Sequence, residues 1–314
     1  METEARITRL IEERGPLTGA ELQAALPPAG PRAQPDPSGD AFRCWRAATL
    51  SDRLAVRRVG TRFLRLDRKV DDFARLSPSI LREFLTYTVV GLAGDTAVLD
   101  REAAKVLAHI QAVSRAKLDL ATGVVAGIAA RFANGQAPEQ RFCVFIAGDV
   151  VYDMAHDVPR PERSTGTMVR GSDLDLVVIA DDAAPEALLQ QLDEAIYQQK
   201  YRHLINPSAR EEIDYIVKRF QRLREQAGFD TFKKMVACKI LQEGVLIHGS
   251  QALFAAARAL LDEHGVSRKL AGMEAAATHL RRQAEEYLLS TEWRILGADE
   301  LHLFFTTDES EEFE

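Results

Sequence analysis

Two aspartates stand two residues apart at the start of an apolar run in the stretch "GSDLDLVVIA", residues 171–180. Alternate residues of a strand share a face, so Asp173 and Asp175 would project together while Leu174, Leu176 and Val178 face the core. Neighbouring carboxylates repel and resist ionisation beside each other, which favours a cation between them. Oxygen-only ligands suit Mg²⁺, with Mn²⁺ as an alternative. The other interpretations are a solvated pair at a strand edge or a cap on a turn.

A third acid, Asp214, lies inside another apolar run, "EEIDYIVK", residues 211–218. A lone charge in such a strand is costly to bury unless it is paired or binds a metal. If this strand lies beside the first one, Asp214 joins the pair. Three carboxylates on adjacent strands could hold two Mg²⁺ ions, which clamp the attacking and leaving oxygens of a phosphoryl transfer. A surface strand position is the alternative for Asp214.

Strands and helices alternate in the part of the chain that carries these acids, which predicts an α/β domain. The expected strands are 141–149, 172–180, 211–218 and 245–249. The expected helices are 185–201, 229–244 and a helical region from 250 to about 290.

In this order, with a strand ending in Gly148, a strand opening with Asp173 and Asp175, and a later strand carrying Asp214, the chain resembles the nucleotidyltransferase superfamily typified by DNA polymerase β. The stretch "CKILQEGVLIHGSQALF", residues 238–254, is similar to the helix–strand–helix that closes its small members, such as the minimal and aminoglycoside-modifying types. The resemblance covers roughly residues 105–262. It implies an α/β (α+β) fold with a mixed sheet flanked by helices.

The resemblance also implies a reaction, the Mg²⁺-dependent transfer of a nucleoside monophosphate from an NTP such as ATP to an acceptor hydroxyl. Asp173 and Asp175 would bind the metals, and Asp214 would complete the site and help to deprotonate the acceptor. The acceptor stays open between RNA, a protein, a nucleotide and a small molecule, because one fold serves many substrates.

The phosphate-binding turn departs from the family pattern, which is Gly-Ser or Gly-Gly around ten residues before the first Asp. Here the turn is Gly148-Asp149, and 23 residues, 150–172, precede Asp173. A carboxylate near a triphosphate is unfavourable unless a metal or an arginine compensates for it. The insertion supplies three arginines, Arg160, Arg163 and Arg170. The candidate nucleotide-binding residues are Gly148, Asp149, Arg170 and Ser172. The alternatives are that Asp149 caps a helix or that the turn has lost nucleotide binding.

The N-terminal region predicts three helices, at 4–15, 17–26 and 41–54, followed by a hairpin around Gly60-Thr61, and this order resembles a winged helix-turn-helix. Between residues 41 and 70, nine Arg and Lys stand against two Asp, an excess of seven positive charges. Such clustering fits contacts with nucleic-acid phosphates, although winged helices also bind proteins. The candidate nucleic-acid-binding residues are Arg43 and Arg46 on the third helix, and Arg57, Arg58, Arg62 and Arg65 on the wing.

The whole chain has 314 residues, 46% of them hydrophobic and 28% charged, and a net charge of −7. The three cysteines are far apart and show no zinc-ligand spacing, and neither a signal peptide nor an apolar run of membrane-spanning length is present. We therefore expect a cytoplasmic protein without a membrane partner, and leave open a homo-oligomer or a partner protein.

We expect five regions: a winged-helix domain (1–70), a helical connector (71–135), a nucleotidyltransferase-like domain (136–262), a C-terminal helical region (263–307) and an acidic tail (308–314). The alternative function is a non-catalytic DNA-binding regulator or antitoxin-like protein whose nucleotidyltransferase domain is degenerate. The Gly148-Asp149 turn and the insertion after it are the features that favour this alternative.

Overall fold

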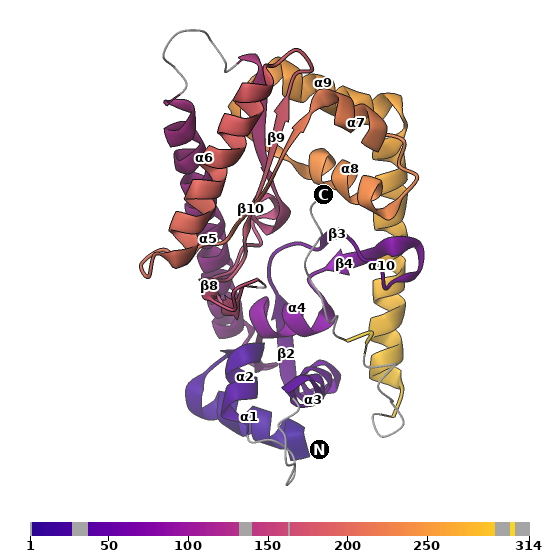
Figure 1. Cartoon of the computed structure of the whole chain (residues 1–314). Helices are drawn as coiled ribbons and strands as arrows, with labels where there is room; N and C mark the ends of the chain where they lie inside the picture. Colours follow the sequence, from indigo (N-terminus) through magenta and orange to yellow (C-terminus); the bar gives the residue numbers. More distant parts are fainter. Residues whose placement is uncertain (1, 27–36, 132–139, 163, 293–301, 305–314) are drawn as a thin grey trace. The chain divides into compact units, whose positions relative to one another are not determined.

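The computed structural model describes residues 2–26, 37–131, 140–162, 164–292 and 302–304 (Figure 1). The chain has the expected mixed α/β (α+β) class, with long helices and small antiparallel and mixed sheets. Its described residues divide into two compact units, of which the first comprises residues 2–26, 37–65, 74–109, 274–292 and 302–304 and the second residues 66–73, 110–131, 140–162 and 164–273. The expected acidic tail, 308–314, lies outside the described residues.

The second unit is built on a four-stranded mixed sheet in the order β10-β9-β6-β11. Its strands are β6 (Phe142–Ala147), β9 (Leu174–Ala180), β10 (Ile213–Arg219) and β11 (Val245–Gly249). Strand β9 runs antiparallel to β6 and parallel to β10, with Asp214 opposite Asp175. The four expected strands are confirmed, and the condition for grouping Asp214 with the aspartates of β9, that the two strands are neighbours, is met.

Helices cover both faces of this sheet (Figure 1). Strand alternation determines which side chains point to which face of the sheet. On one face, Leu174, Leu176 and Val178 are fully buried in a core cluster with residues of α5 (Thr96–Ala129) and α6 (Glu186–Ile205). On the opposite face, Phe145 of β6 packs on Phe254, with ring centroids 5.4 Å apart. This face meets α8 (Phe232–Glu243) and α9 (Gln251–Glu263), while α7 (Phe220–Gln226) follows β10. The alternation directs the side chain of Asp175 to the α8–α9 face.

A turn and a short hairpin connect β6 to β9, where the sequence predicts an insertion. The turn is a 3-10 helix, Gly148–Tyr152, and the hairpin consists of β7 (Pro159–Pro161) and β8 (Met168–Arg170), which pair antiparallel. The hairpin places Arg160 opposite Val169 and returns the chain to the start of β9.

The first unit begins with the three expected helices, α1 (Glu2–Arg14), α2 (Gly19–Ala25) and α3 (Pro37–Leu50). It also holds a three-stranded antiparallel sheet in the order β1-β5-β2, made of β1 (Leu17–Thr18), β5 (Thr88–Leu92) and β2 (Leu54–Arg58). The long helix α10 (Val266–Ser290) contributes its C-terminal part to this unit.

The expected hairpin around Gly60-Thr61 is wrong. Strand β2 pairs with β5, thirty residues later, and β3 (Phe63–Leu66) pairs with β4 (Ala74–Ser77). The region 71–135 is also not purely helical, because α4 (Ile80–Thr86) is followed by β5 before α5 begins. The β-branched run Thr88, Val89 and Val90 favours this strand, and all three residues are buried in the sheet.

The described helices include none that combines the length and the apolar character needed to cross a membrane. All three cysteines, Cys44, Cys143 and Cys238, are buried free thiols.

Candidate metal centre

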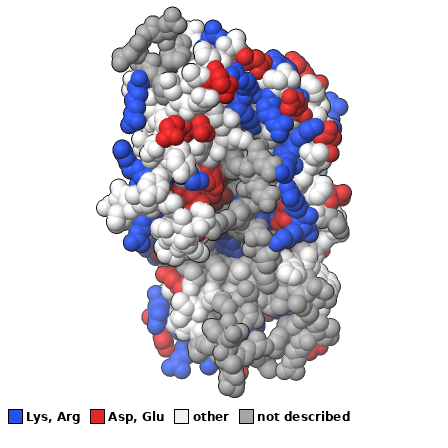
Figure 2. All heavy atoms as spheres, viewed as in Figure 1, with Lys and Arg blue, Asp and Glu red and all other residues white. Residues whose placement is uncertain are grey.

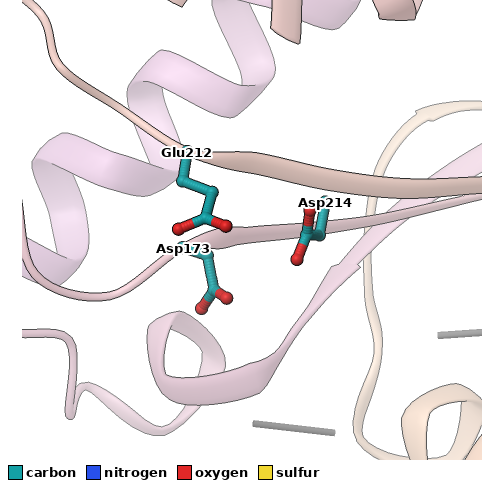
Figure 3. Close-up of side chains that lie close together, drawn as sticks. All are labelled: Asp173, Glu212 and Asp214. Carbon is teal, nitrogen blue, oxygen red and sulfur yellow. The ribbon is translucent and has the colours of Figure 1, made fainter. Parts of the chain in front are cut away.

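Three carboxylates meet where the parallel strands β9 and β10 begin (Figure 3). Asp173 precedes β9, Glu212 precedes β10, and Asp214 is the second residue of β10. Each offers one oxygen within 4.8 Å of those of the other two. The backbone N–H of Leu174 donates to the carbonyl oxygen of Glu212 over 2.9 Å, which brings the two strand starts together. Figure 2, which has the same view as Figure 1, shows acidic side chains near the middle of the visible surface, in the region of β10.

The donor set fits a hard divalent cation. Mg²⁺ binds oxygens at about 2.0–2.1 Å, so opposite ligands of one octahedron lie about 4.2 Å apart. Oxygens within 4.8 Å of one another therefore need only a small side-chain rotation to share one ion. Carboxylate oxygens without nitrogen or sulfur ligands favour Mg²⁺ or Mn²⁺ over Zn²⁺.

Glu212 shows the electrostatic cost of this cluster. The residue is only 6% exposed. Burial raises the pKa of its carboxyl to about 7, against the opposing charge of Arg160, and the charges of Asp173 and Asp214 raise it further. A cation among the three carboxylates would offset both the burial and the repulsion. Sequence reasoning missed Glu212, although it lies two residues before Asp214 and so follows the same strand alternation.

Two basic side chains contact the cluster. Arg160 places its terminal nitrogens 2.9 Å from Glu212 and 3.4 Å from Asp173. Lys200 of α6 places its Nζ 2.7 Å from Asp214 Oδ1. Among the described residues these contacts set two positive charges against the three acids.

Asp175 does not belong to the group of three. A Cβ built on Gly148 would lie 2.2 Å from Asp175 Oδ2, so this carboxylate packs against the α-carbon of the glycine. Gly148 also has a φ of +75°, a conformation that L-residues with a side chain rarely adopt. The structure thus groups Asp173 and Asp214 with Glu212, and the assignment of Asp175 as a metal ligand stays a prediction.

The turn after β6 has internal partners for its polar groups. The backbone N–H of Gly148 donates to Glu243 Oε1 over 3.1 Å, and Glu243 forms a buried ion pair of 2.8 Å with Lys239. Ser172 Oγ donates to Asp149 Oδ2 over 2.8 Å. Two candidate nucleotide-binding residues, Gly148 and Asp149, therefore belong to this turn, and the third, Ser172, is hydrogen-bonded to it from the segment before β9. The side chain of Asp149 is not the N-cap of the 3-10 helix, because Ala147 occupies that position.

Arg170, the fourth candidate for nucleotide binding, ends β8 and is exposed. Its backbone is engaged, since its N–H donates to the carbonyl of Arg210 and its own carbonyl accepts from Lys117. Arg163 lies outside the described residues.

Among the arginines expected to bind nucleic acid, Arg43, Arg46, Arg57, Arg58 and Arg62 have identified partners inside the first unit. On α3, Arg43 pairs with Asp40, and Arg46 donates to the carbonyls of Leu288 and Thr291 at the end of α10. Every residue from 40 to 49 is buried or half-buried. A helix that reads a major groove presents an open face, and this part of α3 does not present one.

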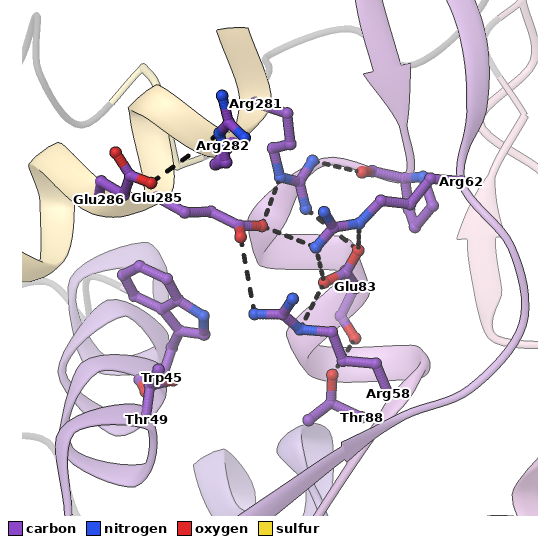
Figure 4. Close-up of polar contacts among 11 residues, drawn as sticks. Trp45, Thr49, Arg58, Arg62, Glu83, Thr88, Arg281, Arg282, Glu285 and Glu286 are labelled. Carbon is purple, nitrogen blue, oxygen red and sulfur yellow. Dashed lines mark hydrogen bonds and ion pairs between the residues drawn. The ribbon is translucent and has the colours of Figure 1, made fainter. Parts of the chain in front are cut away.

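The wing arginines are engaged in the same way. Arg57 pairs with Asp100 over 2.6 Å, and Arg65 is half-buried in β3. Arg58 and Arg62 both contact Glu83 of α4 and Glu285 of α10 (Figure 4). Binding of nucleic acid through these arginines would first break these ion pairs, and it stays a prediction.

Arg281 completes this ion-pair network (Figure 4). It donates to Glu285 over 2.8 Å, to Glu83 over 3.2 Å and to the carbonyl of Pro78 over 2.8 Å. Burial alone would raise the pKa of Glu285, but the hydrogen bond and charge of Arg281, with Arg62 and Arg58, hold it below its ordinary value. The network ties α10 to α4 and the β2–β3 connection.

No protein-family model, curated protein or solved structure matches this chain. Its function is therefore inferred from its own residues and their geometry.

Proposed function

We propose that this protein is a metal-dependent nucleotidyltransferase that moves a nucleoside monophosphate from an NTP to an acceptor hydroxyl and releases pyrophosphate, with Mg²⁺ or Mn²⁺ as its cofactor. The observation that carries the proposal is the group formed by Asp173, Glu212 and Asp214 at the start of two parallel strands. The strand order gives further support, because β6, which ends just before Gly148, lies antiparallel to β9 and β9 lies parallel to β10. This arrangement supports the resemblance to the nucleotidyltransferase superfamily.

In this proposal the three carboxylates hold the cation, which supplies positive charge to the triphosphate when it is bound. Asp214 accepts the proton of the acceptor hydroxyl, and the contact from Lys200 Nζ orients its carboxylate. The N–H of Gly148 and the hydroxyl of Ser172 are donors for phosphate oxygens. These donors become available when Glu243 and Asp149 give up their present hydrogen bonds.

The three helices that precede β2 in the first unit support a winged-helix assignment, but β3, β4 and α4 occupy the β2–β5 connection in place of a simple wing. We propose a cytoplasmic protein whose acceptor is nucleic acid, protein, nucleotide or small molecule. The ion pairs of Arg57, Arg58 and Arg62 favour a packing role for this unit over phosphate contacts.

A second candidate function is a non-catalytic regulator, and one observation favours it. The N–H of Gly148, which would contact a phosphate in an active enzyme, donates to the carboxylate of Glu243. In a regulator this hydrogen bond would persist, and the second unit would bind a ligand or a partner without transferring a nucleotide.

Incubation with labelled NTPs separates the two functions. The purified protein is given each α-labelled NTP, Mg²⁺ or Mn²⁺, and RNA or protein acceptors, beside an Asp173→Asn/Asp214→Asn double variant. Asp119→Asn, at an exposed position of α5, is the matched control. We expect transfer by the wild type and the control and none by the double variant. Transfer that survives the double substitution would refute the assigned site, and no transfer under any condition would favour the regulator.

A further inference from the structure

Arg160 is held between a fixed anchor and the acidic cluster. Its Nε donates to the carbonyl oxygen of Gly171 over 2.7 Å. Its two terminal nitrogens face Glu212 and Asp173, at 2.9 and 3.4 Å. One edge of the guanidinium is thus hydrogen-bonded to the backbone, while the other edge forms ion pairs with two carboxylates of the candidate metal centre.

The backbone around Arg160 is stiff. Pro159 and Pro161 flank it, and each proline ring fixes its own φ. Arg160 also pairs with Val169 across the β7–β8 hairpin. The side chain is therefore presented from a constrained strand, and its position beside Asp173 follows from the local fold.

A divalent cation and the Arg160 guanidinium compete for the same carboxylates. With the cation bound to Asp173 and Glu212, the two positive groups repel each other at short range. An anion between them removes this repulsion. Arginine matches phosphate oxygens through parallel N–H donors, and a triphosphate is the anion that the proposed reaction brings to this site.

We propose that Arg160 is a triphosphate-binding residue that occupies the metal centre until a divalent cation displaces it. The inference rests on the proposed nucleotidyltransferase function and deepens it. In the metal-free state the terminal nitrogens of Arg160 neutralise Glu212 and Asp173. In the metal-bound state the Nε–Gly171 hydrogen bond keeps the guanidinium beside the centre, and the terminal nitrogens bind phosphate oxygens. Arg160 also supplies the positive charge that Asp149 requires near a triphosphate.

Lys200 is less suited to exchange carboxylate partners for phosphate oxygens. Its Nζ contacts Asp214 from α6 as a single compact charge, whereas the planar guanidinium of Arg160 presents two donors to two partners. The geometry therefore assigns phosphate binding to Arg160.

The test measures Mn²⁺ binding and phosphate binding separately, with the full-length chain. Mn²⁺ affinity is measured by electron paramagnetic resonance without nucleotide, and affinity for inorganic triphosphate is measured by calorimetry at saturating Mn²⁺. The variants are Arg160→Gln and Arg160→Lys. Arg141→Gln is the control, because Arg141 makes an exposed ion pair with Asp181. Circular dichroism checks that each variant is folded.

We expect Arg160→Gln to bind Mn²⁺ about tenfold more tightly than the wild type, because a competing charge is removed. We expect it to bind inorganic triphosphate about tenfold more weakly. Arg160→Lys should recover part of the triphosphate affinity, and Arg141→Gln should match the wild type in both measurements.

The outcomes that overturn the inference differ from those that overturn the proposed function. If Arg160→Gln binds Mn²⁺ no more tightly, or triphosphate no more weakly, than the wild type, the role of Arg160 is refuted. The metal centre would survive that result if Asp173→Asn/Asp214→Asn still abolished Mn²⁺ binding. If neither the wild type nor Arg160→Gln binds Mn²⁺ saturably, the metal centre and the proposed function fail together.

Discussion

A buried lysine in the strand of Asp214 gives a pH dependence of stability that can be worked out from the structure. Lys218 of β10 is 7% exposed, and its Nζ donates to Gln226 Oε1 over 2.9 Å. Burial lowers the pKa of Lys218 to about 8, with Arg222 acting in the same direction and Cys238 opposing it. The perturbation is Lys218→Met, which keeps an unbranched side chain and removes the ionisable group.

The difference between an ordinary pKa of 10.5 and a folded-state pKa of about 8 corresponds to about 3 kcal/mol. Between these two pH values the unfolded chain binds more protons than the folded one, so this group makes the free energy of unfolding rise with pH. Its penalty is fully present below pH 8 and is gone above pH 10.5. Lys218→Met removes the penalty and its pH dependence, but leaves Gln226 without this donor at every pH, which costs about 1–3 kcal/mol.

Urea unfolding at several pH values between 7 and 10.5, followed by circular dichroism, measures this effect. We expect the free energy of unfolding of Lys218→Met, minus that of the wild type, to fall by about 3 kcal/mol across the series. Lys105→Met is the control, because the Lys105 side chain is 73% exposed, and its difference should stay flat. A flat difference for Lys218→Met would show that Lys218 is not desolvated and would refute the burial assigned to it.

Two further predictions concern the turn at the candidate site and the ion-pair network of the first unit. Gly148→Ala should lower the free energy of unfolding by about 2 kcal/mol or more, because its Cβ meets Asp175 at a φ of +75°. Gly166→Ala, at a φ of +70° with no atom near its Cβ, should lose about 1 kcal/mol, and equal losses by calorimetry would argue against the packing of Asp175 on Gly148. Arg281→Met should cost about 3 kcal/mol in urea unfolding, because it removes a buried partner of two glutamates. Arg282→Met should change stability by less than about 0.5 kcal/mol, since Arg282 is exposed, and a comparable loss in both variants would contradict the network.

The sequence predicts elements of this fold where local pattern is strong. The apolar runs at 142–147 and 174–180 are central strands, and the alternation that buries Leu174, Leu176 and Val178 is the one expected from the sequence. The pairing of β2 with β5 could not be predicted from a local turn signal, because residues 59–87 separate the two strands. The two-residue strand β1 was too short for a period to show.

The residues of the candidate site also fall into those that the local sequence predicts and those that it does not. Asp173 and Asp214 stand out because each is a charge at the start of an apolar strand, and Glu212 shares the alternation of Asp214. The carboxylate of Glu243 reaches Gly148 from a helix 95 residues later in the chain. A contact over such a sequence separation cannot be predicted from a local pattern. The position of Asp175 against Gly148 likewise depends on how β9 and the turn pack in three dimensions.

The central claim is that Asp173, Glu212 and Asp214 bind a divalent cation, and anomalous diffraction at the manganese edge tests it most directly. Crystals grown with Mn²⁺ should show one anomalous peak in contact with these three carboxylates. Crystals of the Asp173→Asn/Asp214→Asn variant should lack it. A wild-type crystal with no peak at these residues, or with the ion bound instead beside Asp175 and Glu243, would contradict the account.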